Sequence, residues 1–301
     1  MFNKVSIIIP TYKRSNLLER AIESVLNQTY SNIEVVVVDD NIPDSQHRAE
    51  TEIKMKKYST DYRVIYVKNN KSLGGAFARN VGIKNANGKF ITFLDDDDIY
   101  LPHKVGKQLR FMLQNDYDLS FTDVRIHNSD DVLIDYREHN YITSLSNKDL
   151  LKEHLMHHLT PTSTFMFKIE SILKLEGFDD VKMGQEFMLM LKAIERGLNI
   201  GYMQGADVIQ YAHNQERISL GTNKVEKEIE LYNFKKKYFK YLNKKEKTYI
   251  KFRHHAVMMM VGKRSGMHFL FFIHFFKAII TSPKNCLSEL LYFKKKIKKF
   301  N

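Results

Sequence analysis

The sequence has little cysteine and no long apolar run. Its single cysteine, Cys286, excludes an intramolecular disulfide framework and is typical of proteins that work in a reducing compartment. None of its uninterrupted apolar runs approaches the ~18–20 residues that a transmembrane helix needs. Met1–Lys4 leads directly into an apolar run, so we expect a core strand there and no signal peptide. These absences favour a globular protein of the cytoplasm, with any membrane association peripheral and at the inner face of the cell membrane.

Positive charge is unevenly distributed along the 301 residues, whose formal net charge is +12. From Lys224 to Asn301 there are 20 Lys/Arg and 5 Asp/Glu, which leaves 27 and 30 for residues 1–223. The length suits one large α/β domain with an appendage. We therefore predict a domain over residues 1–222 and a basic, aromatic-rich helical region over residues 223–301. Such a tail suits an anionic membrane surface, an acidic partner or nucleic acid.

The most informative stretch is Phe90–Asp98, in which strand-prone apolar residues run into four consecutive aspartates. A buried strand that ends in this way places its carboxylates at the carboxyl edge of a sheet, where ligands bind in open α/β folds. Four adjacent like charges need solvent, protonation or a cation. Hard oxygen ligands suit Mg²⁺ or Mn²⁺, particularly an ion shared with a substrate phosphate. Taken alone, the pattern is equally that of a solvated acidic turn.

Short apolar runs alternate with amphipathic segments through the first third of the chain. Strands are predicted at 5–10, 33–38, 64–67 and 90–94, and helices at 17–27, 44–58 and from Gly75 to a cap at Asn87-Gly88. This alternation indicates a doubly wound, mainly parallel sheet flanked by helices. The second strand also ends in acids, Asp39 and Asp40. Two strands therefore carry carboxylates to the same predicted edge.

The remaining pattern predicts further strands and helices. We expect a helix at 103–114 with Pro102 at its first position, a strand at 119–126 with a hairpin partner at 132–136, a helix at 147–158, a strand at 164–167, a helix at 187–196, strands at 200–203 and 208–211, and helices at 231–242, 248–261, 267–280 and 287–300. His154, His157 and His158 have helical metal-ligand spacing. Because no nearby motif requires a metal, we interpret them as partly exposed surface histidines.

The C-terminal helices are rich in Lys, Phe, Tyr and Met. Phe269–Ile273 is their most apolar stretch, and His268, His274 and Lys277 interrupt or flank it. A helix of this kind lies in a membrane interface or forms the core of a helical hairpin, and both interpretations stay open. A polybasic end after residue 293 adds attraction to an anionic membrane surface. Contact with another copy of the chain, as a homo-oligomer, is the other expected use of this region.

Residues 4–220 resemble the family-2 glycosyltransferases of the GT-A fold, with the family's motifs in their usual order. The segments that carry the resemblance are Val5–Arg14, Ala21–Tyr30, Val36–Asp40, Gly74–Gly82 and the Asp-x-Asp-containing Phe93–Asp98. The resemblance implies an inverting transferase that uses a nucleotide-sugar donor, most often a UDP-sugar. It also implies a divalent cofactor, Mn²⁺ or Mg²⁺.

The resemblance also assigns roles to residues around the donor. The donor-binding residues that it implies are Pro10, Thr11, Tyr12, Arg14, Asp40, Gly75, Arg79, Asp95, Asp96 and Arg217. Among these, Asp40 would bond the uracil ring and Asp95 would lie near the ribose. Asp97 would coordinate the metal. Arg217 belongs to a loop with His213 and Ser219 that would close over the diphosphate.

Gly177-Phe178-Asp179 followed by Gln185-Glu186 resembles the acceptor side of the family's site. The second acid of that segment is usually Asp and acts as general base; here it is Glu186, and Gln185 stands where another acid is usual. Glu186 would then take the proton from the acceptor hydroxyl as that oxygen attacks the anomeric carbon. Without the resemblance, a carboxylate at a helix start is more simply a helix-terminus charge.

The expected function is transfer of a sugar to a hydroxyl of a glycan or lipid-linked acceptor in cell-surface polysaccharide synthesis. The alternative is a non-catalytic nucleotide-binding partner protein with a degenerate transferase domain. A sugar nucleotidyltransferase is disfavoured because residues 10–14 lack the glycine-rich phosphate loop that it needs. Nucleic acid is not an expected partner, since no binding module is recognisable and the basic residues lie outside the domain that carries the acidic site.

Overall fold

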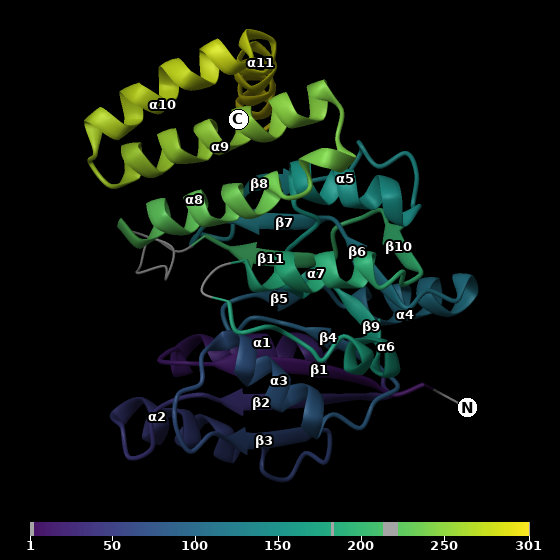
Figure 1. The fold of residues 1–301 in the computed structure, drawn as a ribbon. Coiled ribbons are helices and arrows are strands. Elements are labelled where there is room, and N and C mark those ends of the chain that lie inside the picture. Colours follow the sequence, from purple (N-terminus) through teal and green to yellow (C-terminus); the bar gives the residue numbers. More distant parts are fainter. Residues whose placement is uncertain (1–2, 182–183, 213–221, 301) are drawn as a thin grey trace. The chain divides into compact units, whose positions relative to one another are not determined.

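The computed structural model describes residues 3–181, 184–212 and 222–300 (Figure 1). These residues form two compact units. The first contains the chain up to Leu150, then Leu159–Val181 and Gln185–Ala212. The second contains Leu151–His158 and the helices from residue 222 onward. The predicted domain boundary between residues 222 and 223 adjoins the undescribed residues 213–221 and stays a prediction.

The first unit is built on a seven-stranded sheet. Its strands are β1 (Val5–Thr11), β2 (Ile33–Asp39), β3 (Val64–Lys68), β4 (Phe90–Phe93), β6 (Leu119–Thr122), β9 (Met166–Lys168) and β10 (Ile200–Met203). They lie in the order β10-β6-β9-β4-β1-β2-β3, and every pairing is parallel except those of β9 with β4 and β6. The predicted fold class, a mixed and mainly parallel sheet flanked by helices, is confirmed.

The register of the central strands brings the polar residues that follow them to the carboxyl edge of the sheet. Thr11 of β1 is paired with Asp39 of β2, and Ile8 with Phe93 of β4. The ends of β1 and β2 are therefore level, and the chain after β4 continues beside β1 toward the same edge, with Leu94 N donating to the Ile8 carbonyl oxygen. Apart from the half-buried Pro10, both β1 and β2 are buried along their whole lengths, as expected for parallel strands covered on two faces. Fully burying each Ile or Val contributes about 1.5–3 kcal/mol before entropic costs.

Helices cover this sheet and complete the core. They are α1 (Ser15–Leu26), α2 (Gln46–Met55), α3 (Gly75–Asn85), α4 (Lys104–Asn115), α6 (Ile169–Lys174) and α7 (Gln185–Glu195); α5 (Asn147–His157) begins in the first unit and continues into the second. The apolar stripe of α1, spaced at Leu18, Ala21, Ile22 and Val25, is fully buried against the strands. This spacing is the helical period read in the sequence.

A second, four-stranded sheet corrects one expectation. It contains β5 (Ile99–Tyr100), β7 (Val124–His127), β8 (Leu133–Arg137) and β11 (Val208–Tyr211) in the order β5-β11-β7-β8. The strand predicted at 119–126 is therefore two strands, β6 and β7, in two sheets. They separate at Asp123, whose buried carboxylate accepts hydrogen bonds from Tyr202 Oη at 2.6 Å and Gly205 N at 2.8 Å. The predicted hairpin of β7 with β8 is confirmed.

Two predicted helix boundaries are also wrong. The helix α4 begins at Lys104 with His103 as its N-cap, so Pro102 lies outside it. The helix α3 ends at Asn85 with Ala86 as its C-cap, and Asn87-Gly88 does not cap it. Gly88 instead lies against β1, where a Cβ would stand 2.8 Å from Ser6 N, so its glycine serves a close approach of two backbone segments.

The second unit is helical, with α8 (Thr222–Lys236), α9 (Lys244–Arg264), α10 (His268–Thr281) and α11 (Pro283–Phe300). Figure 1 shows α9 and α10 as an antiparallel pair. Gly262 permits their close approach, since a Cβ there would lie 2.7 Å from Phe271 N, and Gly266 turns the chain at a φ of 66°. Among the described residues, no helix has both the length and the apolar character to cross a bilayer.

The histidines of α5 correct another expectation. His154 is fully buried and its ring lies 6.4 Å from that of His158, so the interpretation as partly exposed surface histidines is wrong for His154. The side chain of Lys235 reaches His158, with Nζ 2.6 Å from Nε2. These side chains form part of the interior of the helical unit.

Candidate active site

The four aspartates leave β4 in a tight turn at the carboxyl edge of the first sheet. The Asp98 backbone N–H closes this turn on the Asp95 carbonyl oxygen, at 3.1 Å. One carboxylate oxygen from each of Asp95, Asp97 and Asp98 lies within 4.8 Å of the other two. Three convergent carboxylates are the hard oxygen donor set that Mg²⁺ or Mn²⁺ takes in proteins. The sequence pointed to Asp97 alone as metal ligand, and the structure places Asp95 and Asp98 beside it.

Asp96 is not part of that group and is buried in the protein. It is 5% exposed, and its carboxylate accepts hydrogen bonds from Thr11 Oγ1 at 2.8 Å and Arg14 Nη1 at 3.4 Å. Burial, and then the negative charge of Asp97, raise the pKa of Asp96 to about 7. Asp96 therefore ties the β1 exit loop to the aspartate turn. Its predicted contact with a donor stays a prediction.

Asp98 is also buried and is held by β11. Its carboxylate accepts from Tyr211 N at 3.1 Å and from Gln210 Nε2 at 3.2 Å. Burial, and then the charges of Asp95 and Asp97, raise the pKa of Asp98 well above its usual range. Two of the four carboxylates thus have a raised pKa, because burial and mutual repulsion both disfavour their charged forms.

Three arginines surround the aspartate turn. Arg14 Nη1 lies 2.6 Å from Asp97 Oδ2, and Arg79 Nη2 lies 2.5 Å from Asp95 Oδ1. Arg20 donates to the Asp97 carbonyl oxygen at 2.7 Å and stacks 3.8 Å from the centre of the Tyr211 ring. The sequence singled out Arg14 and Arg79. It missed Arg20, because an exposed arginine on an amphipathic helix has no distinguishing pattern.

The β1 exit loop holds the other residues predicted from the opening motif. Pro10 is the last residue but one of β1 and pairs with Val38, and Tyr12 follows Thr11 with its side chain 38% exposed. Lys13 adopts a φ of 59°, and its N–H donates to Asn41 Oδ1 at 2.8 Å. An exposed aromatic ring beside the aspartate turn is thereby held on a loop with fixed backbone geometry.

Asp40 is engaged by its own chain. Its two carboxylate oxygens accept from Asn69 Nδ2, Ser72 Oγ, Leu73 N and Gly74 N, at 2.8 to 3.1 Å. These four donors match the four lone-pair positions of a carboxylate. Asp40 thus holds the loop that leads into α3, and its predicted contact with a uracil ring stays a prediction. The neighbouring Asp39 is likewise structural, since it accepts from Tyr66 Oη and pairs with Arg48.

The start of α3 lies beside the start of α7. A Cβ on Gly75 would stand 3.2 Å from Arg79 Nη1 and 3.8 Å from Gln185 Oε1. Gln185 is the first residue of α7, and the half-buried Glu186 follows it in the first turn. The structure thus brings Gln185 close to Gly75 and Arg79, and the role of Glu186 as base stays a prediction.

Two polar residues position the segment before α7, and sequence reasoning assigned neither a role. Asn80 of α3 donates through Nδ2 to the Phe178 carbonyl oxygen and accepts from Phe178 N, each at 2.8 Å. Lys192 of α7 donates to the Gly177 carbonyl oxygen at 2.8 Å and pairs with Asp179 at 2.7 Å. A paired amide contact across 98 residues has no local sequence signal. Arg217, His213 and Ser219 lie outside the described residues.

A family model identifies the family of this chain. The model of glycosyl transferase family 2 matches residues 6–172, which span the β1 loop, the aspartate turn and α3. The chain belongs to this family. The predicted membership is therefore confirmed.

Two relatives match part of the chain. It is 37% identical over 129 residues, 43% of its length, to UDP-Glc:alpha-D-GlcNAc-diphosphoundecaprenol beta-1,3-glucosyltransferase WfgD of Escherichia coli. It is 44% identical over 119 residues, 40% of its length, to an uncharacterized glycosyltransferase of Rickettsia felis. These matches span 49% and 19% of the respective relatives. The chain thus spans half or less of the length of both.

Solved structures share the fold at low sequence identity. TarS 1-349 of S. aureus in complex with UDP-GlcNAc has a TM-score of 0.59 and 17% identity, over 92% of this chain and 89% of that one. Mannosyltransferase PcManGT from Pyrobaculum calidifontis, in complex with GDP-Man and Mn²⁺, has a TM-score of 0.56 and 14% identity, over 100% and 82%. These likenesses show the GT-A fold of this family-2 glycosyltransferase and nothing further about its ligands.

Proposed function

We propose that this family-2 member is an inverting glycosyltransferase that moves a sugar from a UDP-sugar to a hydroxyl of a lipid-linked glycan acceptor. The observation that carries the proposal is the group of Asp95, Asp97 and Asp98 at the sheet edge, with Arg14 and Arg79 paired to it. A nucleoside diphosphate needs cations around its oxygens. The printed names of WfgD and of a second Escherichia coli relative, WfaP, support a UDP-sugar and an undecaprenol-linked acceptor.

The aspartate group fits a divalent ion, Mn²⁺ or Mg²⁺. Its donors are carboxylates alone, and one oxygen from each of Asp95, Asp97 and Asp98 lies within 4.8 Å of the other two. When bound there, the ion would neutralise charge on the departing diphosphate. We assign Asp97 as its principal ligand, with Asp95 and Asp98 completing the protein side. Arg14 and Arg79 would contribute donors to the same diphosphate.

We assign the remaining contacts to the sugar-nucleotide donor from the positions of the residues that would make them. The exposed ring of Tyr12 offers a face for stacking beside the aspartate turn. The carboxylate oxygens of Asp40 already accept four hydrogen bonds. Asp40 would therefore contribute to binding of the uracil ring indirectly, by fixing Ser72–Gly74 and the start of α3. Glycine at position 75 leaves room in front of the Arg79 guanidinium. Arg217 would contribute from beyond the described residues.

Glu186 is the proposed general base. It lies in the first turn of α7, one residue after Gln185, whose side chain approaches Gly75. As the acceptor oxygen attacks, Glu186 would hold the hydroxyl in line and take its proton. The clamp from Asn80 and Lys192 to Gly177–Asp179 would fix the acceptor side of the same edge. Displacement in one step inverts the anomeric configuration and needs no covalent enzyme intermediate.

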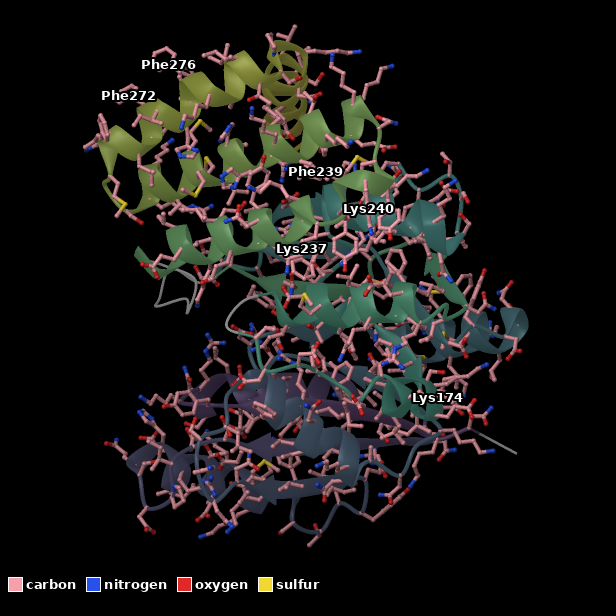
Figure 2. The ribbon with its side chains drawn as sticks, in the orientation of Figure 1. Lys174, Lys237, Phe239, Lys240, Phe272 and Phe276 are labelled. Carbon is pink, nitrogen blue, oxygen red and sulfur yellow. The ribbon has the colours of Figure 1, made fainter. Side chains whose placement is uncertain are left out.

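We further propose that the helical unit docks peripherally on an anionic membrane surface, where a lipid-linked acceptor resides. Phe269, Phe272, Phe276 and Ile280 of α10 follow helical spacing and are 80%, 54%, 58% and 80% exposed. Figure 2 shows Phe272 and Phe276 on the outer side of α10. An apolar helix face in a strongly basic segment is the combination that binds a lipid interface.

The test is thermal unfolding of the full chain with UDP, GDP, CDP or dTDP, each with Mn²⁺ and with EDTA. A ligand at ~100 times its Kd stabilises the fold by about 2.7 kcal/mol. We expect a Mn²⁺-dependent rise in Tm with UDP that Asp97→Asn abolishes. Asp130→Asn, in an exposed loop, is the matched control and should keep the rise. An equal rise in Asp97→Asn and wild type, or none with any nucleotide, would contradict the proposal.

A further inference from the structure

Three histidines meet inside the helical unit, apart from the aspartate group. His254 and His255 are consecutive on α9, and His274 lies on α10. Each is only 8% exposed, and one ring nitrogen from each lies within 4.8 Å of the other two. The ring centres are 5.3 Å apart for His254 and His255, 5.9 Å for His254 and His274, and 5.1 Å for His255 and His274. Three imidazoles therefore converge in one small buried volume.

The closest nitrogens have the spacing of two ligands on one ion. His255 Nδ1 and His274 Nδ1 stand 3.2 Å apart. Two nitrogens bound to a tetrahedral Zn²⁺ at 2.0–2.1 Å would be roughly 3.4 Å apart, so these positions need to move by only a few tenths of an ångström. With both rings neutral and no metal, only a hydrogen on one Nδ1 can occupy this gap. A shared metal ion satisfies both lone pairs.

The third histidine has the outer partner that metal-binding histidines carry. His254 Nδ1 lies 3.1 Å from Glu228 Oε1 of α8, and the His254 ring stacks on Tyr232 at 4.2 Å and 15°. A carboxylate that accepts from Nδ1–H fixes the tautomer in which Nε2 keeps a free lone pair. The stacked tyrosine then holds the plane of the ring. Both contacts orient one nitrogen in advance.

The surroundings decide which ions fit. Imidazole nitrogens suit Zn²⁺, Ni²⁺, Cu²⁺ or Co²⁺ far better than Mg²⁺ or Ca²⁺. All three rings are buried, and a histidine binds a metal ion through a neutral imidazole nitrogen. Lys251 and Lys277 on the same helices oppose a cation, whereas Glu228 favours it and is 13% exposed.

We propose that His254, His255 and His274 bind a transition-metal ion, Zn²⁺ being the best fit, that links α9 to α10 and, through Glu228, to α8. Three protein nitrogens leave the fourth tetrahedral position for water. The site is separate from the aspartate group in residues and in donor chemistry, and it does not depend on the proposed transferase activity. The ion would stabilise the helical unit, because a ligand that binds only the folded state raises the free energy of unfolding.

The experiment uses the full, untagged chain carrying Asp97→Asn, so that the aspartate group is weakened as a competing site. The protein is stripped with EDTA, dialysed and titrated with Co²⁺ as a spectroscopic probe. We expect one equivalent to give the intense visible absorption of tetrahedral Co²⁺ and one equivalent of Zn²⁺ to remove it. Only weak octahedral absorption, with no rise in Tm on adding Zn²⁺, would overturn the proposal.

Variants then assign the ligands. His255→Gln and His274→Gln in the same background should lose the tetrahedral absorption and weaken Zn²⁺ binding by at least about 100-fold, whereas exposed His268→Gln on α10 should change neither. Where a histidine variant fails to fold, Glu228→Gln leaves all three rings in place and should weaken Zn²⁺ binding by about 10–100-fold. Undiminished Zn²⁺ binding in the folded histidine variants would refute the assignment.

Discussion

The Arg14 guanidinium lies 2.6 Å from Asp97 Oδ2, so the carboxylate proposed as principal metal ligand already has a cationic partner. Arg14 also reaches Asp96 at 3.4 Å, and its side chain is 37% exposed. In the absence of a divalent ion, this arginine partly compensates the aspartate turn. A bound ion competes with it for Asp97, and a diphosphate offers the displaced guanidinium new oxygens. Arg14 would therefore couple metal binding to donor binding.

Arg14→Gln tests this coupling. Removing the guanidinium leaves Asp97 without its competitor, so we expect Mn²⁺ alone to bind as tightly as in wild type or more tightly. The loss of a charge-assisted contact should weaken UDP binding in saturating Mn²⁺ by about 10-fold. Isothermal titration measures both constants. Arg137→Gln, exposed on β8, is the control. Weaker Mn²⁺ binding together with unchanged UDP binding in Arg14→Gln would contradict the proposed coupling.

Glu186→Gln separates catalysis from binding. The amide keeps the size of the side chain but cannot take a proton at neutral pH, so kcat should fall about 10²–10⁴-fold. The UDP affinity measured with Mn²⁺ should stay within about 2-fold of wild type, because Glu186 makes no donor contact in the proposed mechanism. Glu186→Asp restores a carboxylate and should recover part of kcat. Full activity in Glu186→Gln would remove it as the base.

The sequence predicted the first sheet well because each central strand is a mostly apolar run bounded by polar residues. Such runs are buried as central strands, as Val5–Pro10 and Ile33–Val38 are. The helical period of α1 identifies the face of that helix that packs against them. The split at Asp123 could not be predicted. Its donors, Tyr202 and Gly205, are about 80 residues further along the chain, so only the folded structure shows why one apolar run becomes two strands.

The candidate site was likewise predicted only in part from the sequence. The aspartate run was visible because four adjacent carboxylates are unusual in any local structure. Which of them face a ligand was not visible, since Asp96 turns inward through Thr11, 85 residues earlier. The buried histidines of α9 and α10 were also missed as a group. His254-His255 and His274 have no recognisable ligand spacing until the hairpin brings the helices together.

Asn80→Ala tests the clamp on the segment before α7. It removes two hydrogen bonds to Phe178, and Gly177 must keep a φ of 68° without them. We expect a loss of about 1–3 kcal/mol in unfolding free energy, measured in urea. Because the clamp serves the acceptor side, the KM for acceptor should rise more than the Kd for UDP. Asn85→Ala, which removes only a local bond on the same helix, should do neither.

The buried Lys104 should make the unfolding free energy depend on pH. Its side chain is fully buried, with Nζ 2.6 Å from Thr92 Oγ1 and 4.0 Å from the centre of the Tyr100 ring. Burial lowers the pKa of Lys104 well below its usual range, and the more distant Asp207 only partly offsets this. The unfolded chain therefore binds a proton that the folded chain does not, from that lowered pKa up to about 10.4. Stability must rise with pH across this window, by at most about 1.4 kcal/mol per pH unit.

Lys104→Met removes the titrating group and keeps most of the side-chain volume. We expect the variant to be more stable than wild type at pH 7, with the difference shrinking steadily toward pH 9.5, because wild type gains stability as the unfolded state loses its proton. Urea unfolding at several pH values measures the difference, which cancels the titration of all other groups. Lys107→Met, an exposed position on the same helix, should show no such trend. A difference that stays constant between pH 7 and 9.5 would mean that Lys104 keeps its proton in the folded protein, held by Thr92 and the Tyr100 ring.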